Sequence, residues 1–374
     1  MAQANRRLGT LGNKLFTNTI AASPYLPMQY GYKDWVPSQS YYSFAARAGC
    51  DPFTAYGSSN TTVLECLRRK DSTTLIAASQ NISASGTYGT WGFLPVTDGK
   101  AVQQLPSIQL QSKALNGQRL LVGNNANEGR EFTPQTITTE DDLVAWLELT
   151  FPLFTKADIS KILLTYPTTN NSVDSSAPLF ATTGDSGPTA LNQSSVGTGQ
   201  QQRANNIYAE TTFVCPSYWM AEAYSGQNGF SSYKYQYSVP LALHGQDVSG
   251  YFGPATAVQG PVFEYAFMNI WGNFITIDNP SISNKIANGA ASNSTASNAA
   301  SSWPTFNVNA PYQLNLNQSG GALLSIPMTA AANATELVGS TLRNDFRLVN
   351  AYTWEGGRGA RCNFWRNMGV AVPE

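Results

Sequence analysis

The sequence is poor in histidine and in charged residues. His244 is the only histidine among 374 residues, which excludes a metal site or mechanism that needs two imidazoles from one chain. Charged residues make up 12% of the chain, against roughly 25% in ordinary soluble proteins. Lys plus Arg (22) nearly balances Asp plus Glu (23), for a net charge of −1. Without a basic excess, nucleic acid is not an expected partner, and the low charge content favours a secreted protein.

Long apolar runs are also missing. No uninterrupted stretch is long enough to span a bilayer, and residues 1–16 lack the apolar core of a signal peptide. We therefore expect no transmembrane segment. Asn-x-Ser/Thr glycosylation motifs nevertheless point to the secretory route, so the sequence predicts that a preceding segment is absent. The motifs begin at Asn60, Asn81, Asn170, Asn192, Asn293, Asn317 and Asn333.

The four cysteines contain no C-x-x-C pair. Their wide spacing fits two structural disulfides better than a metal cage or a redox-active pair. Three pairings are possible for four cysteines, and the spacing leaves all three open. The residues are Cys50, Cys66, Cys215 and Cys362.

Three segments read as buried strands that end in a loop. Residues 18–23 form a short apolar run before a proline, residues 119–122 are apolar and lead into a loop rich in Gly and Asn, and residues 233–239 alternate at period two. Glu128 follows the second strand and His244 the third. Because catalytic side chains gather at the carboxyl ends of parallel strands, we expect these two groups to meet there.

Helices are predicted around this sheet. Residues 38–48 read as a helix, Thr139 and Thr155 each begin a helix with a capping box, and an aromatic stripe over residues 260–274 has helical spacing. We interpret the stripe as core packing. A hairpin is predicted around Asp98 and Gly99.

Two segments of low complexity are predicted to be loops, near residues 168–206 and 283–302, because their Ser, Thr, Asn and Gly residues offer little apolar surface to bury. Residues 341–348 predict a closing strand or helix.

A carboxylate beside an imidazole has a defined catalytic role in acyl transfer. The imidazole takes the proton of a serine hydroxyl and returns it to the leaving group, while the carboxylate fixes the tautomer and stabilises the imidazolium. Taken alone, Glu128 is more often a solvated turn residue, and a single histidine is often a satisfied core or surface group. The motifs around them decide between these readings.

These motifs resemble those of type B carboxylesterases, the cholinesterase-like and fungal lipase family. The acid motif G-x-N-x-x-E-G matches residues 123–129, and the histidine motif H-G-x-[DE] followed by aromatic-F-G matches residues 244–253. Residues 20–30, 95–99 and 303–307 resemble further landmarks of the family. The order, acid before histidine, agrees with that of hydrolases of this fold.

The resemblance implies an α/β fold: residues 1–374 would form a single partial α/β-hydrolase domain, the C-terminal portion with the last strands of a mostly parallel sheet. It implies Glu128 and His244 as catalytic residues, with Asp247 as a supporting group near the imidazole. Neither cofactor nor metal is implied. The partner of the full-length enzyme would be a small-molecule or lipid ester, and the location extracellular.

The nucleophile elbow of that family, G-x-S-x-G, is absent from the sequence, as is its HGG-type oxyanion loop. The chain opens just after the point where the serine is expected, which predicts either a truncation or a lineage that lost its front half. The rival hypothesis is a catalytically inactive binding or adhesion module on the same fold. Residues 184–188 (GDSGP) resemble the serine motif of chymotrypsin-like proteases, but a glycine is missing and the only histidine follows it.

The resemblance also implies which cysteines pair. We expect non-reducing peptide mapping to join Cys50 to Cys66 and Cys215 to Cys362, whereas a peptide that joins Cys50 to Cys215 would contradict it. By chain entropy the short loop would contribute about 3 kcal/mol and the long loop about 5 kcal/mol.

Overall fold

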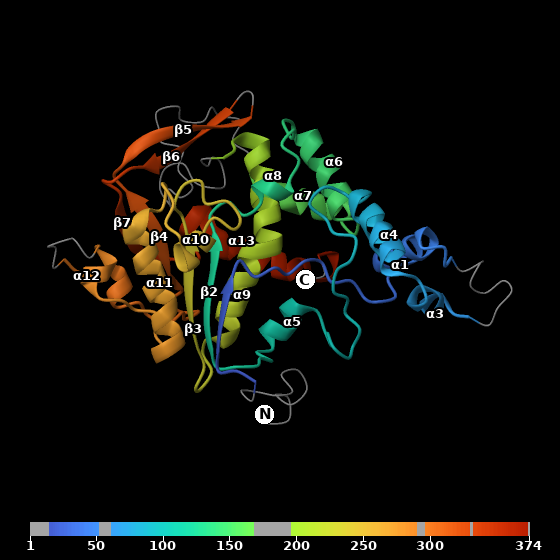
Figure 1. Ribbon diagram of the computed structural model, residues 1–374, viewed down its shortest axis with the longest axis horizontal. Coiled ribbons are helices and arrows are strands. Elements are labelled where there is room, and N and C mark those ends of the chain that lie inside the picture. Colours follow the sequence, from blue (N-terminus) through green and yellow to red (C-terminus); the bar gives the residue numbers. More distant parts are fainter. Residues whose placement is uncertain (1–14, 52–60, 168–195, 290–295, 330–331, 373–374) are drawn as a thin grey trace.

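Five strands form the central sheet, in the order β1-β2-β3-β4-β7. The computed structural model describes residues 15–51, 61–167, 196–289, 296–329 and 332–372, and it places helices on both faces of this sheet (Figure 1). The first four strands run parallel, and β7 pairs antiparallel with β4. The bounds are β1 (Asn18–Ala22), β2 (Arg119–Asn125), β3 (Ser231–Tyr237), β4 (Tyr312–Ser319) and β7 (Arg343–Asn350).

The apolar run of β2 is buried on both faces, as in other parallel sheets. Leu120 and Val122 point into one core, which α9 and α13 cover, whereas Leu121 points into the other, which α11 covers. This alternation follows from the two-residue period of a strand. The predicted strands at residues 18–23, 119–122 and 233–239 are therefore confirmed. The closing element predicted over residues 341–348 is a strand, β7, which begins at Arg343.

The helices begin largely where the sequence predicts. Both predicted capping boxes are present, at Thr139 and Thr155, and the aromatic stripe lies in α11. The helices before β3 are α1 (Trp35–Arg47), α3 (Val63–Arg68), α4 (Ser72–Ala84), α5 (Pro106–Gln111), α6 (Glu140–Thr150), α7 (Lys156–Thr165), α8 (Gly199–Ala209) and α9 (Cys215–Tyr224). Those after it are α10 (Val248–Phe252), α11 (Gly260–Ile277), α12 (Asn284–Ala287) and α13 (Trp354–Met368).

The predicted loop over residues 168–206 is wrong for its C-terminal part, which is helical. Residues 199–209 form α8, which continues through a π-helical turn (Glu210–Val214) into α9. Residues 202–209 are buried despite their polar composition, because partners satisfy their side chains: Asn205 accepts a hydrogen bond from Thr133 and Arg203 pairs with Glu140. Residues 168–195 lie outside the described residues.

The prediction over residues 283–302 is also partly wrong. This segment contains α12 and a 3-10 turn, Ala299–Ser301, and buries Ala287 and Ala300 against the core under α11. Alanine side chains are small enough to let these short turns approach the core closely. Residues 290–295 lie outside the described residues.

The hairpin predicted around Asp98 and Gly99 does not form. The Asp98 carboxylate instead accepts hydrogen bonds from the backbone N–H groups of residues 100–102 and closes a tight turn. Thr97 makes an isolated parallel bridge to Gly31. The side chain thus occupies donors that a hairpin ladder needs.

Both disulfides of the expected pairing are present. Cys50 joins Cys66 near the end of α1, and Cys215 at the start of α9 joins Cys362 in α13, across 147 residues of chain. The second bond ties together two helices that cover the same face of the sheet.

A buried ion network lies beside this second disulfide. The carboxylate of Glu210, which is fully buried, accepts from Arg361 at 2.6 Å and 2.7 Å and from Arg358 at 3.3 Å. Arg358 also donates to the carbonyl of Ala126 at 2.7 Å, in the loop after β2. Helix α13 is thereby connected to the carboxyl end of the sheet.

We predict that Glu210→Gln lowers the free energy of unfolding by about 3–5 kcal/mol, because it leaves two buried guanidinium groups without their counter-charge. Urea denaturation would measure this. The matched control is Glu148→Gln on the exposed side of α6, which is expected to change stability by less than about 0.5 kcal/mol. Equal effects of the two changes would contradict the prediction.

Candidate active site

Two loops meet at the carboxyl end of the sheet. The loop after β2 and the loop after β3 are joined by backbone hydrogen bonds, from Ala126 N to Tyr237 O and from Asn127 N to Ala242 O. The Asn127 side chain donates to Leu241 O at 2.8 Å. Because β2 and β3 are neighbours in the sheet, their loops start side by side and stay together.

Glu128 and His244 come together in these loops. His244 Nδ1 lies 2.6 Å from Glu128 Oε2 although 116 residues separate them in the sequence. The Glu128 side chain is fully buried, whereas 31% of the His244 side chain is exposed. Since a carboxylate only accepts hydrogen bonds, Nδ1 is the donor, and Nε2 is left for chemistry.

The second oxygen of Glu128 has two donors of its own. Ser23 Oγ donates to Oε1 at 2.6 Å, and the backbone N–H of Asn125 donates to it at 2.5 Å. Ser23 directly follows β1, so all three strand ends contribute to one carboxylate. Sequence reasoning identified this strand end but not the serine, because one hydroxyl after a strand carries no signal of its partner.

The imidazole is held by its charge partner and by two aromatic rings. Burial alone would lower the pKa of His244, but the hydrogen bond and the negative charge of Glu128 outweigh it and raise the pKa above 6.5. Phe213 packs on the ring at a centroid distance of 4.4 Å, and Phe132 approaches it edge-on at 5.3 Å. The site therefore favours the imidazolium form.

Asp247 lies beneath the acid loop. Its Oδ1 accepts from the side chain of Asn125 at 3.1 Å, and the same amide donates to Leu243 O at 2.7 Å. Oδ2 is buried and has no hydrogen-bond partner among the described residues. Burial, with a smaller contribution from the Glu128 charge, raises the pKa of Asp247 to about 6. The hydrogen bond of Asp247 thus goes to Asn125, the last residue of β2, which precedes the loop that carries Glu128.

Close packing explains the glycines of the acid motif. A Cβ at Gly123 would lie 2.1 Å from the Tyr235 ring, and one at Gly129 would lie 1.9 Å from the carbonyl oxygen of Asn205. In the histidine motif, Gly245 has φ +81°, a conformation that favours glycine. Gly129 thus lets α8 approach the loop that carries Glu128, and Gly123 leaves room for the Tyr235 ring beside β2.

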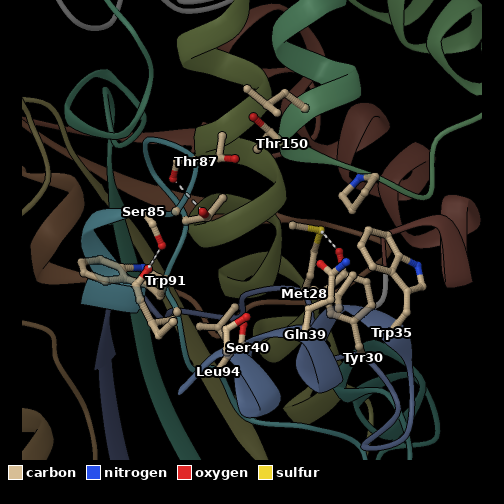
Figure 2. A pocket seen from close by; sticks show the side chains of 18 of the residues that line it. Met28, Tyr30, Trp35, Gln39, Ser40, Ser85, Thr87, Trp91, Leu94 and Thr150 are labelled. Carbon is tan, nitrogen blue, oxygen red and sulfur yellow. Dashed lines mark hydrogen bonds between the residues drawn. The ribbon is translucent and has the colours of Figure 1, made fainter. Parts of the chain in front are cut away.

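A cavity of about 850 Å³ opens among α1, α4, the loop before residue 95 and the end of α6. Figure 2 shows Met28, Trp35, Trp91 and Leu94 among the side chains around it. A smaller pocket shares Met28, Trp91 and Leu94 with it and is also lined by Tyr25 and Tyr208. The rings of these two tyrosines lie 5.6 Å and 6.4 Å from that of Phe213, which packs on His244. Aromatic side chains thus connect the imidazole with the cavity.

The described residues show neither a candidate metal site nor a membrane-spanning helix. Within the described ranges, no cluster of three or more His, Cys, Asp or Glu residues could hold a metal ion. Nor does any helix in this part of the chain have the length and apolar character needed to cross a bilayer.

The profile of the carboxylesterase family matches residues 7–334. The chain belongs to this family. The structure is similar to the solved structure of Aspergillus niger EstA, with a TM-score of 0.64 and 18% sequence identity. The similarity covers the whole of this chain and 63% of that protein. The sheet and its helices therefore have the α/β-hydrolase fold.

Relatives in the family include two fungal lipases. Lipase 2 of Geotrichum candidum is 33% identical over 42% of this chain and 28% of its own length, and Secreted lipase 4 of Gibberella zeae is 23% identical over 75% and 46%. Neuroligin-2 of Rattus norvegicus is 33% identical over 27% of this chain and 11% of its own length. The present chain thus spans less than half the length of each of these relatives.

The raised pKa of Asp247 makes stability depend on pH. The folded protein binds the Asp247 proton more tightly than the unfolded chain does. The stability that this proton contributes is therefore fully present below pH 3.8, the ordinary pKa of the group, and is lost as the pH rises to about 6. We predict that Asp247→Asn, which cannot titrate, removes this pH-dependent loss of stability. Relative to wild type, the variant should gain at most about 3 kcal/mol between about pH 4 and pH 7, at about 1.4 kcal/mol per unit.

Denaturation midpoints of the Asp247→Asn variant and of wild type at about pH 4 and pH 7 measure this difference in stability. Asp141→Asn, in the exposed first turn of α6, is the control. A stability difference between Asp247→Asn and wild type that stays constant with pH would contradict the assignment.

Proposed function

We propose that this chain supplies the acid and the base of a carboxylic-ester hydrolase. The observation that carries the proposal is the 2.6 Å contact between buried Glu128 and partly exposed His244. An ordinary structural ion pair has no need to keep one face of an imidazole open to solvent. Two fungal relatives are named as lipases, which supports an ester substrate.

The proposed mechanism begins with proton transfer to His244. Nε2 takes the proton of a serine hydroxyl while that oxygen attacks the ester carbonyl, and Glu128 stabilises the resulting imidazolium through Nδ1. Nε2 then returns the proton to the leaving alkoxide. Water repeats the sequence on the acyl-enzyme, so that acid, alcohol and free serine are restored.

The serine itself must come from a segment outside this sequence, which contains no G-x-S-x-G. We propose that residues 1–374 form one partial α/β-hydrolase domain and that the chain is inactive alone. The cavity beside Trp91 is proposed to receive the apolar part of the ester, because apolar and aromatic groups line much of it. The two disulfides and the secreted fungal relative favour an extracellular location.

A binding module without catalysis is the second candidate. It draws on the absence of G-x-S-x-G and on the segment similar to Neuroligin-2. A binding surface, however, gains nothing from a buried carboxylate that raises the pKa of an imidazole. We therefore favour the hydrolase.

The decisive experiment measures hydrolysis of a p-nitrophenyl ester. We expect no turnover above background from the 374-residue chain, because His244 has no serine to deprotonate. A longer chain that joins this sequence to a G-x-S-x-G segment should hydrolyse the ester, and Glu128→Gln should reduce its kcat by roughly 10⁴-fold.

Asp141→Asn in the longer chain is the control and should retain full activity. Turnover by the 374-residue chain that His244→Ala abolishes would overturn the assignment of a missing nucleophile. An inactive longer chain that binds a protein partner would favour the second candidate.

A further inference from the structure

A second, smaller sheet projects from the end of the central one. β5 (Ala322–Thr329) and β6 (Ala332–Val338) form an antiparallel ribbon. It is inserted between β4 and β7, which pair in unbroken register from Tyr312 and Asn350 to Ser319 and Arg343. The ribbon begins at the pair Ala322 and Val338, so its two ends leave the tip of the β4-β7 hairpin together. The register of the central sheet does not require it.

The ribbon reaches back to both loops of the candidate site. Met328 in β5 packs against a small separate core that joins Leu241 and Leu243 of the histidine loop with Ala334 of β6 and Val196. Leu243 directly precedes His244. Figure 1 shows β5 and β6 beyond the end toward which β2 runs, where these loops lie.

The same stretch of β5 binds the acid loop. The carbonyl of Met328 accepts a hydrogen bond from Arg130 Nη2 at 3.3 Å, and Arg130 directly follows the acid motif that ends at Gly129. Met328 therefore packs with its side chain against the core shared by the ribbon and the histidine loop, and binds the acid loop with its backbone. Leu241 and Leu243 are only 4% and 8% exposed, so this apolar contact is well buried.

We propose that the β5-β6 ribbon is a clamp that positions His244 against Glu128, with Met328 and Arg130 as its positioning residues. It acts on the imidazole through Leu243 and on the carboxylate through the acid loop. The proposal rests on the proposed function only in treating Glu128 and His244 as a catalytic pair. Its test needs no ester, so its failure and the failure of the hydrolase assignment are separate results.

The single histidine allows a site-specific test in the 374-residue chain. Diethyl pyrocarbonate modifies neutral imidazole, so the rate at which His244 gains the adduct, followed by mass spectrometry across pH, reports its exposure and its pKa. In a variant without residues 322–338, Gly321 is joined to Gly339, and both have positive φ values suited to a turn. We expect the rate at neutral pH to rise several-fold and the pKa to shift down toward 6.5.

Point variants separate clamping from other effects. Met328→Ala should shift both readouts in the same direction by a smaller amount, and Met328→Leu should restore wild-type values. Leu323→Ala, on the same strand but 69% exposed, should change neither. Glu336→Gln removes a charge of the ribbon and should also leave the pKa of His244 nearly unchanged, because the acidic groups with the largest effect on that pKa are Glu128, Asp247 and Glu131.

Unchanged rate and pKa in a folded variant lacking residues 322–338 would overturn the proposal. If that variant does not fold, as judged by circular dichroism, the comparison of Met328→Ala with Leu323→Ala decides. Equal values for these two would then overturn it, and a selective effect of Met328→Ala would support it.

Discussion

The carboxylate of Glu128 is removed completely from water, and the arrangement around it provides the hydrogen bonds that make this burial tolerable. A buried charge costs several kcal/mol unless donors replace the lost water. Its three donors belong to Ser23, Asn125 and His244, which follow or end three neighbouring strands. The pairing of Ala22 with Gly123, and of Gly123 with Tyr235, brings these strand ends level. A slip of one residue in either pair would separate a donor from the carboxylate.

The sequence was sufficient to predict elements whose signals are local. Capping boxes at Thr139 and Thr155 set the helix starts, and the apolar run of β2 identified a strand buried on both faces. The motifs around Glu128 and His244 predicted that the two would meet, and the 2.6 Å contact agrees. Their catalytic role stays a proposal.

What the sequence did not predict depends on partners that are distant in the chain. The composition of residues 199–206 indicates a solvated loop, yet residues 202–206 are buried. Thr133 and Glu140 bind Asn205 and Arg203 of this segment from other elements. Nothing in the sequence around Ser23 indicates that its hydroxyl binds the carboxylate of Glu128. Likewise, the position of Asp247 near His244 in the sequence could not show that its hydrogen bond goes to Asn125, since that choice depends on how two separate loops cross.

Polar residues also support the acid loop from below. Lys234 in β3 is fully buried and donates to Asn124 at 2.7 Å and to Ser217 at 2.8 Å, while burial lowers its pKa well below the ordinary value. Arg358 of α13 donates to the carbonyl of Ala126 and to the side chain of Gln236 in β3. The alternating polar positions of β3 thus face a second, hydrogen-bonded layer instead of solvent. Through this layer, helix α13 is mechanically coupled to the loop that carries Glu128.

The two edges of the central sheet are not equivalent. At one edge β7 runs opposite to its neighbour, whereas at the other β1 is parallel to β2 and, among the described residues, has β2 as its one strand partner. A strand that joined β1 in the parallel sense would end on the side of the sheet where Ser23, Glu128 and His244 gather. The direction of β1 therefore determines that a residue following such a strand would lie at the same end of the sheet as His244.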